Sequence, residues 1–290
     1  MLTIAFPAQA FDTNCYVLAP QSGEDCVIVD PGVGVEEMLR EILAQHRLRP
    51  AAVLLTHGHV DHVYSVTPVC GSDTAAYIHA DDRYRLHDLL GRSNPGLIAM
   101  FEQQFGAAAT WTEPTNVVEI GDGARLTLAG MEFDVLHAPG HTEGSVMFGI
   151  DRVPDGIREQ VDVDRTMVTG DVLFAGSVGR TDLPGGDPAA MQRSLRDVVL
   201  PLPDTTLVLP GHYQATTMAQ ERATNPYLKD LPARAPRSPR PPRSCRSAAS
   251  PSTSRPSASS SSASSTSSAR RSSCTGSRRS RPGPSSRSSG

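Results

Sequence analysis

The chain has 290 residues and a formal net charge of −4, and 38% of its residues are hydrophobic. This length suffices for one large domain or two small ones with a substantial core. Of the 27 Lys and Arg residues, 12 are Arg within 233–290, which holds no Lys, Asp or Glu. Residues 1–232 therefore hold 15 basic and all 31 acidic residues, a net charge of about −16. Because nucleic-acid binding depends on Lys and Arg, this balance makes a nucleic-acid partner unlikely and favours small-molecule partners.

The beginning of the sequence and its cysteines favour a cytoplasmic protein. The first residues, MLTIAFPAQAFD, lack the basic and apolar blocks of a secretory signal, and no apolar run approaches the length of a membrane span. The five cysteines show no regular spacing. Reduced thiols are the simplest interpretation, although Cys15 and Cys26 could face each other on paired strands. We expect no membrane partner, and the pattern leaves the oligomeric state open.

Short apolar runs alternate with helical patterns along the first 232 residues, which predicts an α/β fold with a mixed sheet. Two helices are expected, at 35–48 and at 187–200, the second with Asp187 as N-cap and Pro188 at its first position. The expected strands lie at 15–19, 25–32, 51–57, 75–79, 117–123, 124–130, 131–141, 145–150, 165–174 and 205–213.

Two segments do not fit this alternation. Residues 83–116 are less regular but carry apolar residues, and they form either a lid over a pocket or a segment packed on the sheet. Residues 233–290 contain no Val, Ile, Leu, Met or aromatic residue, so we expect a disordered Arg/Ser/Pro/Ala-rich tail after a folded domain at 1–232. The tail could be a basic segment that contacts nucleic acid or membrane. We favour the other interpretation, that it is not a native coding segment and results from a shifted reading frame in GC-rich DNA.

The sequence THGHVDH, at 56–62, places His57, His59, Asp61 and His62 directly after an apolar strand. Residues with this spacing cannot lie on one face of a helix, but a tight loop can turn them toward two adjacent points. Chance occurrence of such a cluster is low, so the motif predicts metal binding.

Three later strands also end in residues able to bind a metal, namely His141, Asp171 and His212. Taken alone, each histidine is more often a hydrogen-bonded structural residue, and an Asp after Thr-Gly is often a turn residue or a helix cap. Beside THGHVDH, the three become the missing ligands. Five His and two Asp form a nitrogen and oxygen set suited to zinc, with iron or manganese as alternatives. Of the other histidines, His137 is expected nearest the site.

The stretches THGHVDH, APGHTEGS, TGDVLF and LPGHY resemble, in order and spacing, the motifs of the metallo-β-lactamase superfamily. Within it, FAGSVGRTDLPGGDP and PGHYQATTMAQERATNPYL resemble compact bacterial glyoxalase II-like (hydroxyacylglutathione hydrolase-like) hydrolases. The resemblance covers most of 1–232. It implies a four-layer αββα sandwich with mixed sheets and a binuclear metal site at the edge between the two sheets.

The resemblance also implies roles for individual residues. The first of two divalent metal ions would be held by His57, His59 and His141. The second would be held by Asp61, His62 and His212, with Asp171 bridging the two, so that Asp61 and Asp171 are the candidate catalytic residues.

Four further residues are candidates for supporting the ligands or the substrate. Asp30, in IVDPG, would orient ligands, while Arg180 and Asp182 would brace the loop after Asp171. Tyr213 departs from the close relatives, which usually have Gly after the last histidine, and it would narrow the pocket or stack on substrate.

Two such ions, about 3.5–4 Å apart, can share a bridging hydroxide and stabilise an oxyanion. This chemistry suits thioesters because a thiolate leaves without a strong general acid. No G-x-S-x-G nucleophile motif occurs in 1–232. We therefore expect a metal-dependent hydrolase that acts by attack of this hydroxide on a small-molecule thioester of a low-molecular-weight thiol, such as S-lactoylglutathione.

Three alternatives stay open. The first is a mononuclear iron persulfide dioxygenase, a class of enzymes with the same fold and the GRTD feature. The ligands of the second metal do not exclude it, because such enzymes often retain these residues. The ERATNPYL stretch favours the hydrolase. A nuclease of the same superfamily fits poorly with the acidic body and the lack of an inserted second domain. A non-catalytic binding protein is disfavoured because all seven ligand positions are filled.

Overall fold

The computed structural model describes residues 1–89, 99, 103, 111–229 and 231. The predicted tail at 233–290 and most of segment 83–116, expected either as a lid or as a segment packed on the sheet, therefore lie outside the described residues. The chain divides into two units, Met1–Ser238 and Pro239–Gly290, and the features below belong to the first.

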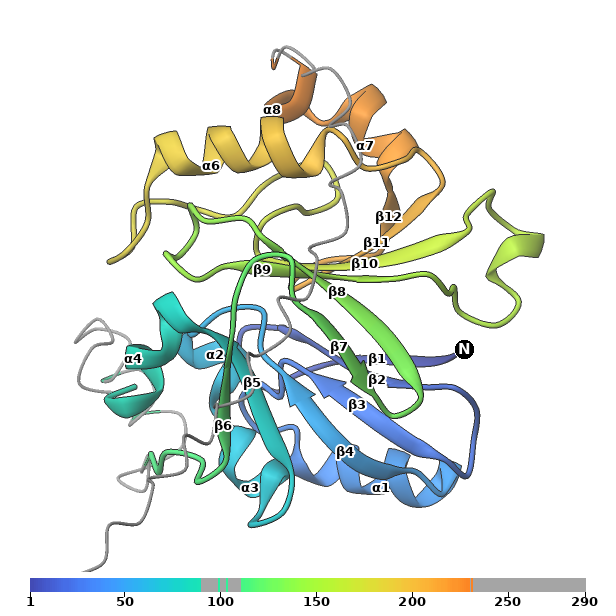
Figure 1. Cartoon of the computed structure of the whole chain (residues 1–290), viewed down its shortest axis with the longest axis vertical. Coiled ribbons are helices and arrows are strands. Elements are labelled where there is room, and N and C mark those ends of the chain that lie inside the picture. The colour runs from blue at the N-terminus through green and yellow to red at the C-terminus, as the bar shows by residue number, and fades with distance from the viewer. Residues whose placement is uncertain (90–98, 100–102, 104–110, 230, 232–290) are drawn as a thin grey trace, which may run out of the picture. The chain divides into compact units, whose positions relative to one another are not determined.

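The first sheet is mixed and follows the chain order β1-β2-β3-β4-β5-β6 (Figure 1). β1, β2 and β3 pair antiparallel, whereas β3 to β6 run parallel. The strands are β1 (Leu2–Pro7), β2 (Asn14–Ala19), β3 (Asp25–Val29), β4 (Arg49–Leu54), β5 (Ala75–His79) and β6 (Val117–Ile120).

The second sheet has the order β12-β11-β10-β9-β8-β7. Only β10 and β11 pair in parallel, and the other neighbours are antiparallel. Its strands are β7 (Arg125–Leu128), β8 (Met131–His137), β9 (Val146–Ile150), β10 (Arg165–Gly170), β11 (Thr206–Pro210) and β12 (Thr216–Thr217).

Helices lie on the outer face of each sheet, with α1 and α3 under the first sheet and α6, α7 and α8 over the second (Figure 1). None of the helices in the described part of the chain is long and apolar enough to cross a bilayer. The helical elements are α1 (Glu36–His46), α2 (Val60–Val63), α3 (Val66–Cys70), η1 (Ala80–Asp82), α4 (Arg83–His87), η2 (Ile157–Glu159), α6 (Pro188–Ser194), η3 (Leu195–Val199), α7 (Met218–Thr224) and α8 (Pro226–Lys229).

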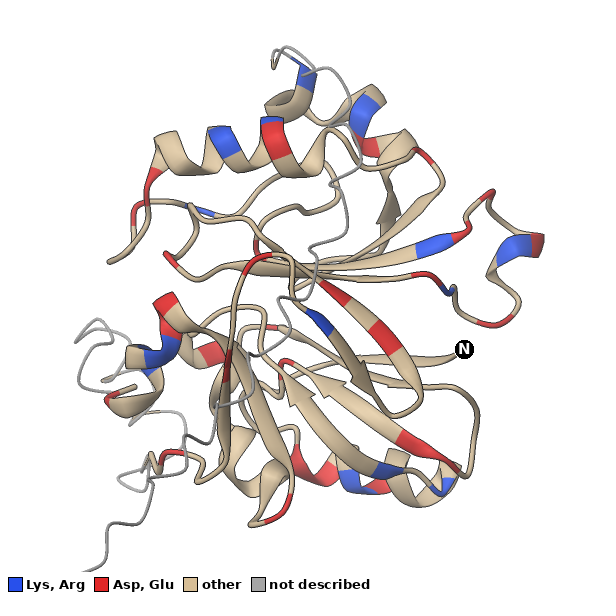
Figure 2. Cartoon of the chain, in the orientation of Figure 1, with Lys and Arg blue, Asp and Glu red and all other residues tan. Residues whose placement is uncertain are grey.

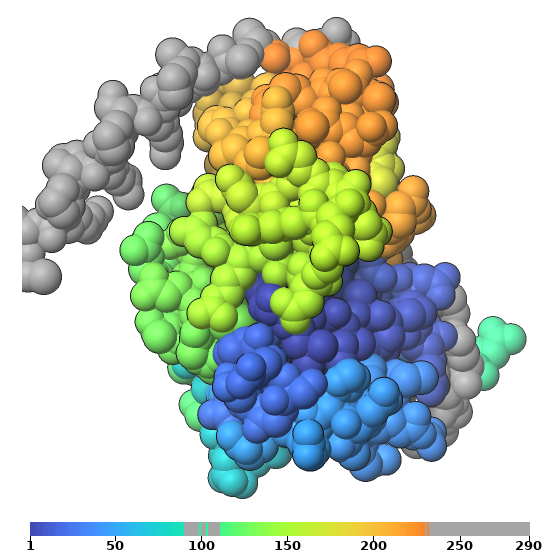
Figure 3. All heavy atoms as spheres, turned by 90° about the vertical axis from the view of Figure 1, so that its right-hand side faces the viewer, coloured from blue at the N-terminus to red at the C-terminus, as the bar shows by residue number. Residues whose placement is uncertain are grey.

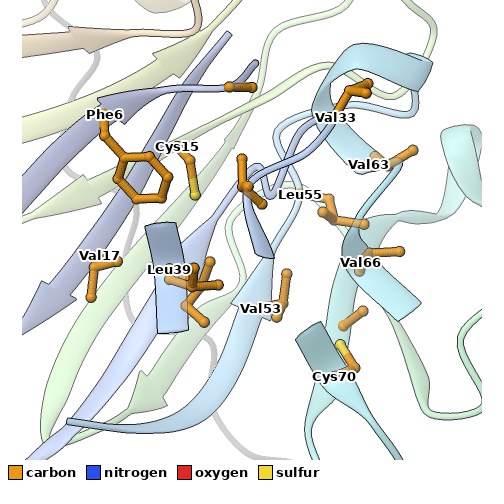
Figure 4. Packing of buried hydrophobic residues seen from close by; sticks show 14 of the residues in the cluster. Phe6, Cys15, Val17, Val33, Leu39, Val53, Leu55, Val63, Val66 and Cys70 are labelled. Carbon is orange, nitrogen blue, oxygen red and sulfur yellow. The ribbon is translucent and has the colours of Figure 1, made fainter. Parts of the chain in front are cut away.

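Buried hydrophobic side chains fill the three spaces between these four layers. Because side chains alternate along a strand, Val17 of β2 packs toward Leu39 of α1, while the adjacent Leu18 packs into the space between the sheets. Figure 4 shows the first of these clusters. On β9, Phe148 faces the space between the sheets and Met147 faces the outer helices. This arrangement confirms the expected four-layer αββα sandwich.

The structure corrects the possible pairing of the first two cysteines. Tyr16 of β2 pairs with Val29 of β3 and Leu18 pairs with Val27, so Cys15 and Cys26 lie toward opposite ends of these strands. Both thiols are buried and free. Burial raises the pKa of Cys26 to about 12, so this thiol stays protonated at neutral pH.

The connection between β9 and β10 contacts the beginning of the chain. The α-amino group of Met1 donates hydrogen bonds to the Val153 carbonyl at 2.9 Å and to Asp155 Oδ1 at 2.8 Å. Figure 3 shows this connection, in yellow-green, lying over the dark blue first strand. In Figure 1 this end of the sheets is opposite α2, which carries the last residues of the candidate metal-binding motif.

Charged residues of both signs lie on the outer helices. Along α6 and η3, Figure 2 shows Arg and Asp close together instead of a patch of Arg and Lys alone. Arg196 and Asp197 form one such pair at 3.0 Å. The described helices therefore offer mixed charge on the outer face of the second sheet.

The predicted cap of α6 is present and provides a test of local stability. Asp187 accepts hydrogen bonds from the amides of Ala189 and Ala190. We expect Asp187→Ala to lower the free energy of unfolding by about 1 kcal/mol, because two helix amides lose their acceptor. Urea denaturation measures this change, with the exposed Asp162→Ala as control. Equal stability of the two variants would contradict the capping role.

Candidate metal centre

Strand ends from both sheets bring the predicted metal-binding residues to one place. The 57–62 motif follows β4 of the first sheet, whereas Asp171 follows β10 and His212 follows β11 of the second. His141 lies in the loop between β8 and β9. His59 is extended at the N-cap of α2, so His57 and His59 point to a different position from Asp61 and His62 of the helix. The site therefore forms at the edge where the two sheets meet.

The first triad consists of His57, His59 and His141. His59 Nδ1 lies 3.2 Å from His57 Nε2 and 2.8 Å from His141 Nε2, and the two Nε2 atoms are 3.2 Å apart. Three nitrogens on one tetrahedral ion at about 2.0–2.1 Å would be about 3.3 Å apart. The three nitrogens therefore have spacing close to that of a tetrahedral site.

The second triad consists of Asp61, His62 and His212. Asp61 Oδ2 lies 3.5 Å from His62 Nε2 and 3.3 Å from His212 Nε2. Asp171 lies between the triads, with Oδ1 3.3 Å from His62 Nε2 and Oδ2 3.4 Å from His141 Nε2. All seven predicted residues are thus together, and Asp171 has the position expected of a bridge. Their individual roles as ligands stay predictions.

Two buried atoms in the centre support a metal ion as the missing partner. His62 Nε2 and Asp171 Oδ1 are buried without an assigned hydrogen-bond partner, although they lie 3.3 Å from each other. Leaving a buried polar atom unsatisfied costs about 1–3 kcal/mol. A cation between the two triads would satisfy both atoms, so the donor set fits a divalent metal.

The two triads differ in protonation. Burial and the neighbouring imidazoles lower the pKa of His57, and the same causes lower that of His59 to about 3. Burial opposes a charge on His62 also, but the carboxylates of Asp171 and Asp61 raise its pKa well above the usual value. His57 and His59 are therefore neutral at neutral pH, whereas His62 carries a proton that a metal must displace.

Asp30, which the resemblance of IVDPG implied as a residue that orients ligands, contacts the second triad. It is buried in a left-handed conformation, with a φ of 49°, and its Oδ2 lies 2.9 Å from His62 Nδ1. The same carboxylate accepts hydrogen bonds from the Thr56 amide and hydroxyl. A proton on Nδ1 leaves His62 Nε2 free toward the centre. Thr13, which sequence reasoning missed, donates to Asp61 Oδ2 at 3.1 Å.

Arg180 and Asp182 form a local pair instead of contacting the triads through their side chains. Their two hydrogen bonds are both 2.7 Å long, and both side chains are exposed. The group of this loop that contacts the centre is the Arg180 carbonyl, which lies 2.8 Å from His141 Nδ1. The Arg180–Asp182 pair thus lies on the loop after Asp171, which the two residues were predicted to brace. It is next to the Arg180 carbonyl, which orients His141.

Asp82 is a supporting residue that sequence reasoning missed. It is fully buried, and its Oδ2 accepts hydrogen bonds from the Gly58 amide at 2.8 Å and the Thr142 hydroxyl at 2.7 Å. Its Oδ1 accepts from the Gly144 amide and from Arg85 Nε. One carboxylate therefore ties both loops of the first triad together. Its position just after β5 repeats the pattern of a strand followed by an acid, which was the available signal.

The C-terminal motif supports the loop after Asp171. Glu221 is buried and accepts hydrogen bonds from the Gly176 amide at 2.8 Å and the Thr216 hydroxyl at 2.7 Å. Asn225 Nδ2 donates to the Ser177 carbonyl at 3.1 Å. The Glu and Asn of ERATNPYL thus hold a loop that leads to the metal centre, without contacting the predicted ligands.

A further group, His79, Asp81 and His137, does not fit a metal. The two imidazoles stack with centroids 4.0 Å apart and planes 13° apart, so their in-plane lone pairs cannot converge on one ion. His137 Nε2 lies 2.8 Å from the Glu143 carbonyl. This histidine is therefore close to the His141 loop, as expected, but outside the two triads.

The protonation difference predicts an order of metal loss. As pH falls, protons compete with a metal most strongly at His62, because its pKa without metal is raised, while His57 and His59 stay neutral. The second metal should therefore dissociate before the first. Metal content after equilibrium dialysis at a series of pH values measures this order. Loss of both metals together, or of the first one earlier, would contradict it.

The Asp82 contacts predict a second effect on metal binding. Asp82→Asn keeps the size of the side chain but places an amide where backbone amides require an acceptor. We expect metal affinity of the first triad to fall about 10–100-fold. Competition with a chromophoric chelator measures it, and Asp81→Asn, the exposed neighbour on the same turn, is the control. Unchanged metal affinity in Asp82→Asn would show that the hydrogen bonds of the Asp82 carboxylate are not needed for metal binding.

Comparison with known proteins agrees with this geometry. Residues 8–153 match the metallo-beta-lactamase superfamily. An uncharacterised protein of Mycobacterium tuberculosis is 45% identical over 235 residues, which cover 80% of this chain and 99% of that protein. The hydroxyacylglutathione hydrolase GloC of Haemophilus influenzae is 32% identical over 228 residues, covering 77% of this chain and 95% of GloC.

Solved structures share the architecture. The BLEG-1 B3 metallo-beta-lactamase has a TM-score of 0.62 and 33% identity, covering 78% of this chain and 99% of that one. TTHA1623 in a di-iron-bound form has a TM-score of 0.59 and 35% identity, and the match covers 78% of this chain and 100% of that one. With the order of the motifs, the paired sheets and these similarities in agreement, the chain belongs to the metallo-β-lactamase superfamily.

Proposed function

We propose that this protein is a metal-dependent, glyoxalase II-like hydrolase of thioesters of a low-molecular-weight thiol, resembling S-lactoylglutathione. The observation that carries the proposal is the pair of triads on either side of Asp171, which offers two complete donor sets to two divalent ions. The named activity of the similar Haemophilus protein, hydroxyacylglutathione hydrolase, supports the same substrate class. A cytoplasmic location and a small-molecule partner belong to this proposal.

The residues would hold zinc, iron or manganese, and the di-iron form of TTHA1623 keeps iron among these candidates. When bound, two such ions supply a water of lowered pKa as nucleophile and positive charge for the developing oxyanion.

The protein's own residues orient and desolvate this centre. Asp30 fixes the ring of His62, the Arg180 carbonyl fixes that of His141, and Thr13 fixes the carboxylate of Asp61. The buried imidazoles exclude water, which strengthens the electrostatic interactions there. All five histidines at the centre belong to the two triads. Such a site suits a thiolate leaving group, which needs no strong general acid.

The iron persulfide dioxygenase is the second candidate, because the first triad alone offers three nitrogens to a single ion. Metal analysis together with oxygen uptake on a thiol persulfide separates the two. One iron per chain with oxygen consumption would favour the dioxygenase.

A panel of thioesters tests the hydrolase directly. The protein loaded with zinc, and separately with iron, is assayed with S-acyl derivatives of glutathione, coenzyme A and other thiols. We expect hydrolysis of at least one thioester and little turnover of a β-lactam, the class named by the similar BLEG-1 structure. Turnover of the β-lactam alone would overturn the proposal.

Two ligand variants test the division into triads. We expect His57→Ala to remove most metal and activity, and His212→Ala to keep the first metal but lower kcat by about 100-fold or more. Metal content per chain and thioester kinetics measure both effects. His87→Ala, whose side chain is 80% exposed, is the control. Two retained metals in His212→Ala would show the assignment to be wrong.

A further inference from the structure

Tyr213 has a strained backbone directly beside the metal centre. It follows His212, its φ is 68°, and its side chain is 68% exposed. Residues other than Gly pay a free-energy cost in this left-handed region. An exposed aromatic ring gains little from burial that would offset this cost, so packing alone does not explain the residue.

The surrounding structure holds this conformation from the opposite sheet. Asn14, at the beginning of β2, donates from its amide to the Gly211 carbonyl at 2.7 Å. Its side-chain nitrogen donates to the Pro210 carbonyl at 3.0 Å and to the Tyr213 carbonyl at 2.8 Å. Three hydrogen bonds from one residue thus fix the segment that carries His212 and Tyr213. Strain that contacts hold in place in this way gathers at functional sites.

The ring of Tyr213 forms one side of an aromatic group at the second triad. Its centroid lies 5.5 Å from that of the buried Phe174, at 75°, and 6.3 Å from that of His212. Phe174 in turn lies 5.9 Å from His212. Phe174 therefore supports one side of the Tyr213 ring, while most of the ring is exposed to solvent beside His212 of the second triad.

We propose that Tyr213 is a specificity residue that packs against an aromatic or branched apolar acyl group of the thioester. This inference rests on the proposed function. It assigns the acyl side because low-molecular-weight thiols carry polar or charged groups, whereas acyl groups can be apolar. The guanidinium of Arg180 on the nearby loop is already paired with Asp182, which leaves the aromatic surface as the stronger feature here.

Binding of two carboxylate products tests the inference without requiring turnover. Isothermal titration calorimetry compares benzoate with acetate on the full-length, zinc-loaded protein. We expect the wild type to bind benzoate about three- to tenfold more tightly. Tyr213→Gly should abolish this preference, whereas Tyr213→Phe should keep it. Tyr227→Ala, which removes an exposed tyrosine on α8, is the matched control and should also keep it.

The melting temperature distinguishes a strained specificity residue from an ordinary packing residue, because replacing them with Gly should shift Tm in opposite directions. Because Gly adopts this backbone conformation without strain, metal-free Tyr213→Gly should melt about 2–4 °C higher than the wild type. A lower Tm combined with an unchanged benzoate preference would identify a packing residue and overturn the inference.

Kinetics separates this inference from the proposed function. For benzoyl and acetyl thioesters of one thiol, Tyr213→Gly should raise KM for the benzoyl substrate about three- to tenfold, with a smaller effect on kcat. Hydrolysis of both thioesters without any Tyr213-dependent preference would overturn the inference and leave the hydrolase intact. If no thioester is hydrolysed but benzoate binding still depends on Tyr213, the proposed function fails and recognition by the ring stands.

Discussion

The structure of the metal centre depends on the cost of burying charge where two sheets meet. Asp171 and His62 are buried and Asp61 is partly buried, and burial opposes the charged form of each of these ionisable groups. Their mutual attraction offsets this cost, so the pKa of both carboxyls is lowered and that of His62 is raised. A divalent ion would replace the proton of His62 as the positive partner. The same burial that makes the empty arrangement costly therefore favours metal binding.

Loops that carry ligands lack the repeating hydrogen bonds of a sheet, so other elements must hold them in position. Asp82, after β5, holds backbone amides on both sides of the first triad. Asn14, at the start of β2, holds the backbone around His212, and Glu221 of α7 holds the loop after Asp171. Each of these contacts joins a polar side chain to the backbone of a distant loop. Ligand geometry is therefore fixed by long-range contacts as much as by the motifs.

The sequence allowed the ligand positions to be predicted because strand ends and metal-binding residues coincide along the chain. THGHVDH, His141, Asp171 and His212 each follow an apolar strand, and parallel or neighbouring strands place their ends at one edge. The supporting residues left a weaker signal. Asp82 contacts Thr142 across 60 positions, and Asn14 contacts Pro210 across 196. A single sequence contains no information that pairs such distant residues.

The short strands were also harder to predict than the buried ones. β12 has two residues, and β1 is an edge strand with a single buried residue, so neither shows a long apolar run. Yet β1 pairs with β2, which carries Asn14 at its beginning, and β12 leads into α7 with Glu221. These weakly patterned elements thus position the residues that hold the His212 and Asp171 loops. The strained Tyr213 lies on the same fixed segment as His212, so metal binding at the second triad and the proposed contact with the acyl group would depend on one set of hydrogen bonds.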